Sequence, residues 1–283
     1  MELTERLYVS DVDGTLFENG EPKISEEGAE LFRKLVKRGI AFTIASGRNL
    51  YGVYDLAQEC GITLPVIAYN GSAIYDFQKG KMLRYFAMEQ TAVARLCGLF
   101  DGANLPFKAC VYFKNQERCL TFNQNGYRSS LWTDRAVHPK SGLLYDEPTV
   151  GKGVSEILSG ECLYVGTSGK REVLEPLYQR IEKLPNIQPV FHQSPYDSEK
   201  WFIDVGAEQA GKGTAALALK EMIGAKELIV YGDNHNDIPM LKAADRAYVV
   251  SAASPEVAAY ADAKLPQRKD SVLKSVWEEN QED

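Results

Sequence analysis

The strongest constraint in this sequence is an alternation of short apolar runs with longer segments that have helical spacing. Residues 7–10 form an apolar run that is too short for a helix, and residues 25–38 then carry apolar side chains three and four positions apart. Residues 40–45 and, after a second helical segment, residues 66–69 repeat the apolar run. Alternating strands and helices of this kind predict a parallel sheet with helices on its faces.

The same rhythm resumes near residue 212, after a long middle segment with strands and helices of its own. We therefore expect an α/β fold: a Rossmann-like, doubly wound parallel sheet with a second domain inserted into it. Residues 1–86 and 207–283 are predicted to form this core. Residues 87–206 are predicted to form the inserted α+β domain.

Composition narrows the possible partners. The chain carries 32 Lys+Arg and 39 Asp+Glu, a formal charge of -7, which disfavours nucleic acid because phosphate backbones require cationic surfaces. No apolar run approaches the roughly 20 residues that span a bilayer, and the first six residues lack the order of a signal peptide. We therefore expect no membrane partner. The five cysteines contain no CxxC pair, so we expect free thiols, which suit a cytoplasmic location.

Polar clusters follow the predicted core strands at the points where each strand ends. These clusters are Asp11 with Asp13, residues 46–48 (SGR), residues 70–71 (NG), and residues 233–237 (DNHND). Ligands of open parallel sheets bind beyond the carboxyl ends of the strands, so we expect these clusters to meet at one sheet edge.

Carboxylates gathered at one edge repel each other unless a cation compensates, and Mg²⁺ suits such a site because it binds few carboxylates and keeps positions for water and phosphate. Asp11 and Asp233 are the expected direct ligands, with Asp13 contributing through its backbone carbonyl. Asp11 can also attack phosphorus to give an acyl phosphate. The side chain of Asp13 can then protonate the leaving oxygen and later accept a proton from water.

Three further groups can bind phosphate. Ser46 and the N–H of Gly47 can donate hydrogen bonds to phosphate oxygens at a helix N-terminus. Lys212, between two glycines at the return from the inserted segment, can supply a fixed positive charge.

These residues resemble the four motifs of the haloacid dehalogenase-like superfamily of phosphatases. Residues 11–16 (DVDGTL) resemble its first motif, Ser46 its second, Lys212 its third, and residues 232–237 (GDNHND) its fourth. The order and spacing also match. The long insertion between the second and third motifs, together with residues 232–241, is similar to the Cof-like hydrolases, in which the insertion is a cap.

The resemblance implies the roles given above for Asp11, Asp13, Ser46 and Lys212, and it implies magnesium at Asp233. It adds Asn236 as a contact to substrate or phosphate. It also implies that Asp237 orients the metal site or Lys212, and that the loop at Asn70 faces the substrate. His235 stands at a variable motif position and receives no role.

Each residue also has a simpler interpretation. The DxDGT run alone is typical of a turn, Ser46 can cap the next helix, and Asp237 can do the same. Lys212 can be a solvated surface lysine. Arg48 suits a structural ion pair better than a contact to the reacting phosphate. Asn70 stays open, because Asn-Gly is itself a turn signal.

The motifs together favour Mg²⁺-dependent hydrolysis of small phosphate monoesters, such as sugar phosphates or phosphorylated cofactors, through a phospho-aspartyl intermediate. Transfer of the phosphoryl group to a sugar, as in phosphomutases, is the alternative. A non-catalytic binding protein with the same fold is a third hypothesis. The expected partner is a small phosphorylated metabolite. The sequence does not fix the oligomeric state, for which we lean to a monomer.

Overall fold

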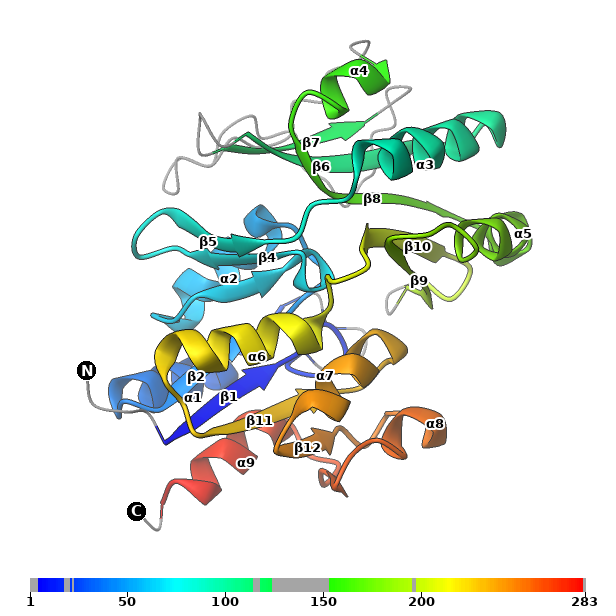
Figure 1. Cartoon of the computed structure of the whole chain (residues 1–283). Helices are drawn as coiled ribbons and strands as arrows, with labels where there is room; N and C mark the ends of the chain where they lie inside the picture. Colours follow the sequence, from blue (N-terminus) through cyan, green and yellow to red (C-terminus); the bar gives the residue numbers. More distant parts are fainter. Residues whose placement is uncertain are drawn as a thin grey trace. The chain divides into compact units, whose positions relative to one another are not determined.

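The computed structural model describes residues 5–17, 21, 23–113, 118–123, 153–194 and 197–281. The chain forms two compact units, Met1–Leu83 with Gly211–Asp283 and Arg84–Ala210 (Figure 1). They overlap the predicted core and inserted domains, whose boundaries at 86/87 and 206/207 stay predictions. Each unit is described by itself.

The first unit is built on a five-stranded sheet in the order β13-β12-β11-β1-β2, with every neighbouring pair parallel. Figure 1 shows β1 between β11 and β2. The strands are β1 (Arg6–Ser10), β2 (Ala41–Ile44), β11 (Glu227–Gly232), β12 (Arg246–Val249) and β13 (Ala263–Lys264). The predicted doubly wound parallel sheet is therefore confirmed.

The central strands have apolar interiors, because helices pack on both faces of this sheet. Leu7 and Val9 of β1 belong to one buried cluster with residues of α6 and α7. Tyr8 points to the opposite face, where Phe42 packs between it and Phe32 of α1. The helices of the unit are α1 (Glu26–Lys37), α2 (Leu50–Cys60), α6 (Lys212–Ile223), α7 (Ile238–Ala243), α8 (Pro255–Ala258) and α9 (Ser271–Glu279).

Helix α1 begins and ends where its sequence predicts. The Ser25 side chain accepts a hydrogen bond from the N–H of Gly28, which is the expected N-cap. Gly39 follows the helix with a positive φ of 81°, as a residue that stops a helix should.

The third predicted core strand belongs to a different sheet. β3 (Val66–Ala68) pairs with β4 (Ala73–Asp76), which pairs with β5 (Lys81–Tyr85), in a three-stranded sheet. A single parallel bridge between Ala45 and Ile67 links β3 to the end of β2. The apolar run identified a fully buried strand of the core unit but carried no information on its pairing partner, so only the expectation that it joins the parallel sheet was wrong.

The second unit has a five-stranded sheet in the order β7-β6-β8-β10-β9, in which the pairs are antiparallel. Helices α3 (Gln90–Gly102) and α5 (Arg171–Ile181) share one buried cluster with this sheet, which confirms an α+β domain. The unit also contains the short helix α4 (Gly153–Ile157). The strands are β6 (Phe107–Phe113), β7 (Arg118–Asn123), β8 (Glu161–Gly169), β9 (Ile187–Gln193) and β10 (Trp201–Ala207).

Two other expectations concern the whole chain. Within the part that the structure describes, every helix is too short or too polar to cross a membrane. Cys60, Cys97 and Cys162 are buried free thiols, whereas Cys110 is disulfide-bonded, so the expectation of free thiols throughout was wrong. Spacing along the chain does not report which thiols a folded sheet brings together.

Candidate active site

The predicted polar clusters follow strands that are neighbours in the first unit. Asp11 comes directly after β1, and its N–H donates to the carbonyl of Tyr231 on β11. Asp233 comes directly after β11. Ser46 follows β2, and its N–H donates to the carbonyl of Ile67 on β3. Parallel pairing thus carries residues that are more than 200 positions apart to one edge of the sheet.

Lys212 lies at the centre of this edge, with 1% of its surface exposed. Its ammonium group donates to the carboxylate of Asp11 and, at 2.7 Å, to that of Asp237. Burial alone would lower the pKa of Lys212, but Asp11 and Asp237 outweigh burial and raise it. The interpretation of Lys212 as a solvated surface residue is therefore wrong.

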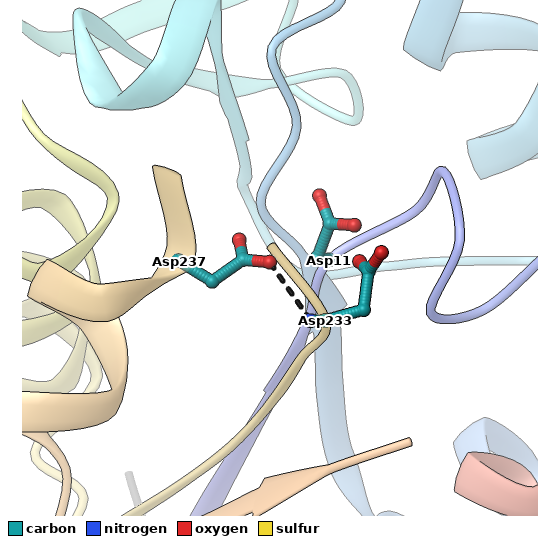
Figure 2. Close-up of side chains that lie close together, drawn as sticks. All are labelled: Asp11, Asp233 and Asp237. Carbon is teal, nitrogen blue, oxygen red and sulfur yellow. Dashed lines mark hydrogen bonds between the residues drawn. The ribbon is translucent and has the colours of Figure 1, made fainter. Parts of the chain in front are cut away.

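Three carboxylates surround this ammonium group. Within the described residues, Asp11, Asp233 and Asp237 each place a carboxylate oxygen within 4.8 Å of the other two (Figure 2). Burial, followed by the charge of Asp237, raises the pKa of Asp11 well above its usual range against the lowering effect of Lys212. The same two causes raise the pKa of Asp233 to about 7. One lysine therefore leaves this cluster short of positive charge.

Asp237 is the carboxylate of the three that is already fully engaged. One of its oxygens accepts from Lys212, and the other accepts from the backbone N–H groups of Asp233 and Asn234 at 3.0 and 3.1 Å. Figure 2 shows its carboxylate reaching toward the backbone of Asp233. Asp237 thus closes the loop that precedes it and contacts Lys212, whereas its side chain makes no capping hydrogen bond to α7, the helix that it was expected to cap. The carboxylates that could hold a metal are therefore those of Asp11 and Asp233.

The DxDGT run lets Asp233 approach Asp11. Gly14 has a φ of +91°, and a Cβ at this position would overlap the carboxylate of Asp233. The Thr15 hydroxyl donates at 2.6 Å to Oδ1 of Asp233, whereas Oδ2 is the oxygen nearest to that Cβ position. In Figure 2 the carboxylates of Asp11 and Asp233 project to the same side of the strand ends. The run is a turn, as its composition suggests, and the turn shapes a carboxylate pair that fits a hard divalent cation.

Ser46 is fully buried, and its hydroxyl accepts from the N–H of Arg48 at 3.1 Å. The predicted helix N-terminus is displaced from this residue, because α2 begins at Leu50 and Asn49 is its N-cap. The capping interpretation of Ser46 is therefore wrong. Ser46 and Gly47 therefore lie in the loop between β2 and α2, where a hydroxyl and a backbone N–H can bind an anion without a helix.

Asn70 joins two of the predicted clusters. It has a left-handed backbone with φ 53°, its N–H donates to the carbonyl of Ser46, and its side-chain oxygen accepts from Asn236 at 3.2 Å. A Cβ on Gly47 would lie 2.9 Å from that same oxygen. Asn70 therefore fixes the Ser46 loop against Asn236, a function that the Asn-Gly turn signal did not reveal.

Arg48 forms an ion pair with Asp13, in line with its structural interpretation. Its Nε donates to one carboxylate oxygen at 2.8 Å and its Nη2 donates to the other.

His235 is exposed and pairs with Glu256. Trp132 and His138, two residues without an assigned role, lie outside the described residues.

Comparisons with known proteins agree with this geometry. The family model of the haloacid dehalogenase-like hydrolases matches residues 8–275. A phosphoglycolate phosphatase of Thermoplasma volcanium is 36% identical over 239 residues, which are 84% of this chain and 81% of that protein. The 5-amino-6-(5-phospho-D-ribitylamino)uracil phosphatase YwtE of Bacillus subtilis is 26% identical over 264 residues, with 87% and 88% covered.

Among solved structures, a haloacid dehalogenase-like hydrolase from Bacteroides thetaiotaomicron superposes with a TM-score of 0.71 at 20% identity. The match covers 97% of this chain and 99% of that one. At this identity the likeness shows the fold alone.

Proposed function

The chain belongs to the haloacid dehalogenase-like hydrolases, a family of enzymes, and from this premise we propose that it hydrolyses small phosphate monoesters with Asp11 as the nucleophile. The observation that carries the proposal is the buried chain of contacts from Asp11 through Lys212 to Asp237. It holds the Asp11 carboxylate in one orientation beside a cation, which is what an attacking carboxylate requires.

The metal proposed for this site is Mg²⁺, held by the carboxylates of Asp11 and Asp233 and by the backbone carbonyl of Asp13. The crowded carboxylates support it, because burial and mutual repulsion disfavour their charged forms unless a cation is present. When bound, Mg²⁺ neutralises these carboxylates and the charge on the phosphate oxygens.

The proposed reaction has two steps. In the first, an Asp11 oxygen forms a bond to phosphorus, the bond from phosphorus to the ester oxygen breaks, and Asp13 donates a proton to that leaving oxygen. In the second, a water oxygen forms a bond to phosphorus and the bond to Asp11 breaks. The Asp13 carboxylate takes the proton from this water, which restores both aspartates and releases phosphate.

Phosphate binding is assigned to Ser46, the N–H of Gly47, Lys212 and Asn236. The link through Asn70 supports this set, because it connects the Ser46 loop to Asn236. Lys212 also contacts the nucleophile, so it can stabilise charge on the phosphoryl group as the group moves to Asp11.

The proposed substrates are small organic phosphates, such as sugar phosphates or phosphorylated cofactors. The relatives named above support this class, since phosphoglycolate and the phosphoribitylaminouracil are both small monoesters.

The test is release of phosphate from a panel of monoesters with Mg²⁺, and with EDTA as the metal-free control. We expect Asp11→Asn to abolish turnover while the fold is kept, and Asp101→Asn, on the exposed surface of α3, to leave turnover unchanged. Trapping a phosphorylated chain that hydroxylamine cleaves would identify the acyl phosphate. Near-full activity of Asp11→Asn would refute the nucleophile, and preferential transfer to a sugar hydroxyl over water would favour a phosphomutase.

A further inference from the structure

Arg48 holds the side chain of Asp13 with two parallel hydrogen bonds. Its Nε lies 2.8 Å from Oδ2 and its Nη2 lies 2.5 Å from Oδ1. Such a fork fixes the plane and direction of a carboxylate, whereas one lysine contact would fix only a distance. Asp13 and Arg48 are about one-quarter exposed, at 24% and 27%, so the pair stands where solvent reaches it.

Arg48 is itself held through its guanidinium group and through its backbone. Its carbon lies 5.0 Å from the centre of the Phe17 ring, which is buried. The N–H of Arg48 donates to the Ser46 hydroxyl at 3.1 Å, and its carbonyl accepts from the N–H of Tyr69 at 3.0 Å. Phe17 is part of the same turn as Asp13, because its N–H donates to the carbonyl of Val12. Arg48 therefore ties the turn that carries Asp13 to the loop that carries Ser46.

We propose that Arg48 is a positioning residue that fixes the orientation of the Asp13 side chain for the second half of the reaction. This inference rests on the proposed function. After the first step Asp13 has given up its proton, and the same carboxylate must then accept a proton from the attacking water. A carboxylate oxygen has two acceptor positions, so a fork that uses one on each oxygen is compatible with a hydrogen bond from water.

The inference separates the two half-reactions. A p-nitrophenyl leaving group departs without a proton, so formation of the phosphorylated enzyme from p-nitrophenyl phosphate does not need Asp13 in a fixed place. Hydrolysis of the phosphorylated enzyme does, because water is a weak nucleophile until a base removes its proton. Loss of the Arg48 fork should therefore slow the second step and spare the first.

The experiment compares wild type with Arg48→Gln, Arg48→Lys, Asp13→Asn and the double variant Arg48→Gln/Asp13→Asn in rapid-mixing assays with p-nitrophenyl phosphate and Mg²⁺. We expect Arg48→Gln to keep the first-turnover rate within about threefold and to lose about ten- to a hundredfold in steady-state rate, so that a burst of nitrophenolate appears or grows. The steady-state rate of Arg48→Lys should lie between those of the wild type and Arg48→Gln. The double variant should be no slower than Asp13→Asn, because the fork has nothing left to hold.

Two further readouts separate positioning from other roles. Inhibition by inorganic phosphate should be unchanged in Arg48→Gln, whereas an arginine that bound the phosphate would weaken it. Arg33→Gln, which removes a surface arginine that donates to the carbonyl of Glu59, is the matched control and should behave as wild type. Arg48→Lys keeps the positive charge and serves as the test if Arg48→Gln does not fold.

An equal loss in first-turnover and steady-state rates, weaker phosphate inhibition, or an additive loss in the double variant would each overturn the inference. If the wild type is active and the Arg48 variants keep its first-turnover and steady-state rates, this inference is overturned and the proposed function stands. A folded wild type that hydrolyses no phosphate ester would refute the proposed function and this inference with it.

Discussion

Asp233→Asn should make the metal-free protein more stable at neutral pH, although it removes a proposed metal ligand. In the folded chain the pKa of Asp233 rises from 3.8 to about 7, with burial as the main cause and Asp237 as the second. A raised pKa means that folding favours the protonated form. Its contribution to stability is therefore complete below pH 3.8 and is lost as the pH rises through about 7.

The size of the effect follows from the shift. A difference of about three pKa units at 1.36 kcal/mol per unit gives a ceiling of about 4 kcal/mol. The Asp233 side chain is partly exposed, so solvent screening reduces this to about 2 kcal/mol. Asparagine has a similar shape and no charge, and it can still accept from Thr15.

The assay is thermal or denaturant unfolding in EDTA from pH 4 to pH 8. We expect the two proteins to be equally stable near pH 4 and Asp233→Asn to be ahead by about 2 kcal/mol at pH 8, or about 5 °C in Tm. Excess Mg²⁺ should reverse this order, because a ligand that binds only the folded state stabilises it and the variant lacks one ligand. Parallel pH profiles for the two proteins in EDTA would refute the charge-crowding argument.

Substitutions at three further positions test other parts of the site. Lys212→Met should abolish turnover and lower the free energy of unfolding by about 3–5 kcal/mol at neutral pH, since it leaves Asp11 and Asp237 buried without their cation. The panel assay measures turnover, and calorimetry measures stability. Gly14→Ala should weaken Mg²⁺ binding by about tenfold or more in a titration of activity against Mg²⁺, because its Cβ meets Asp233 in a backbone of positive φ; unchanged affinity would contradict this. Asn70→Gly should keep the free energy of unfolding within about 1 kcal/mol and lower activity. Asn70→Ala should lower both activity and stability, because glycine adopts a φ of 53° without strain and alanine does not. Equal unfolding free energies for these last two variants would show that the left-handed backbone carries no strain.

The convergence of Asp11, Ser46 and Asp233 could be predicted from the sequence because it depends only on topology. Parallel strands put their carboxyl ends at one edge whatever the details of packing, so a polar residue after each strand must arrive there. Lys212 was predictable for a similar reason, as the first residue of the helix that begins where the chain returns to the core.

The contacts made by Arg48 and Asn70 could not be predicted in the same way. Whether Arg48 reaches Asp13 or a phosphate depends on the rotamers of two side chains and on the Phe17 ring beneath them. The Asn-Gly signal indicates a turn, but the contact from Asn70 to Asn236 joins residues 166 positions apart and depends on how two loops pack. Strand pairing has the same limit, since β3 has the pattern of a core strand and pairs with β4 instead.

The balance of charge around Asp11 gives a reason for a single divalent cation. The carboxylates of Asp11, Asp13, Asp233 and Asp237 face two cations, Lys212 and Arg48, through the contacts described above. When all six groups are ionised, these four carboxylates exceed the two cations by two negative charges, which one Mg²⁺ neutralises. Lys212 donates to Asp11 and Asp237, and Arg48 donates to Asp13. Within the described residues, Asp233 is therefore the carboxylate of this set that accepts no hydrogen bond from an ammonium or guanidinium group. The excess charge therefore lies at Asp233 and beside Asp11, where the metal is proposed to bind, and it would repel a phosphate dianion until a cation neutralises it.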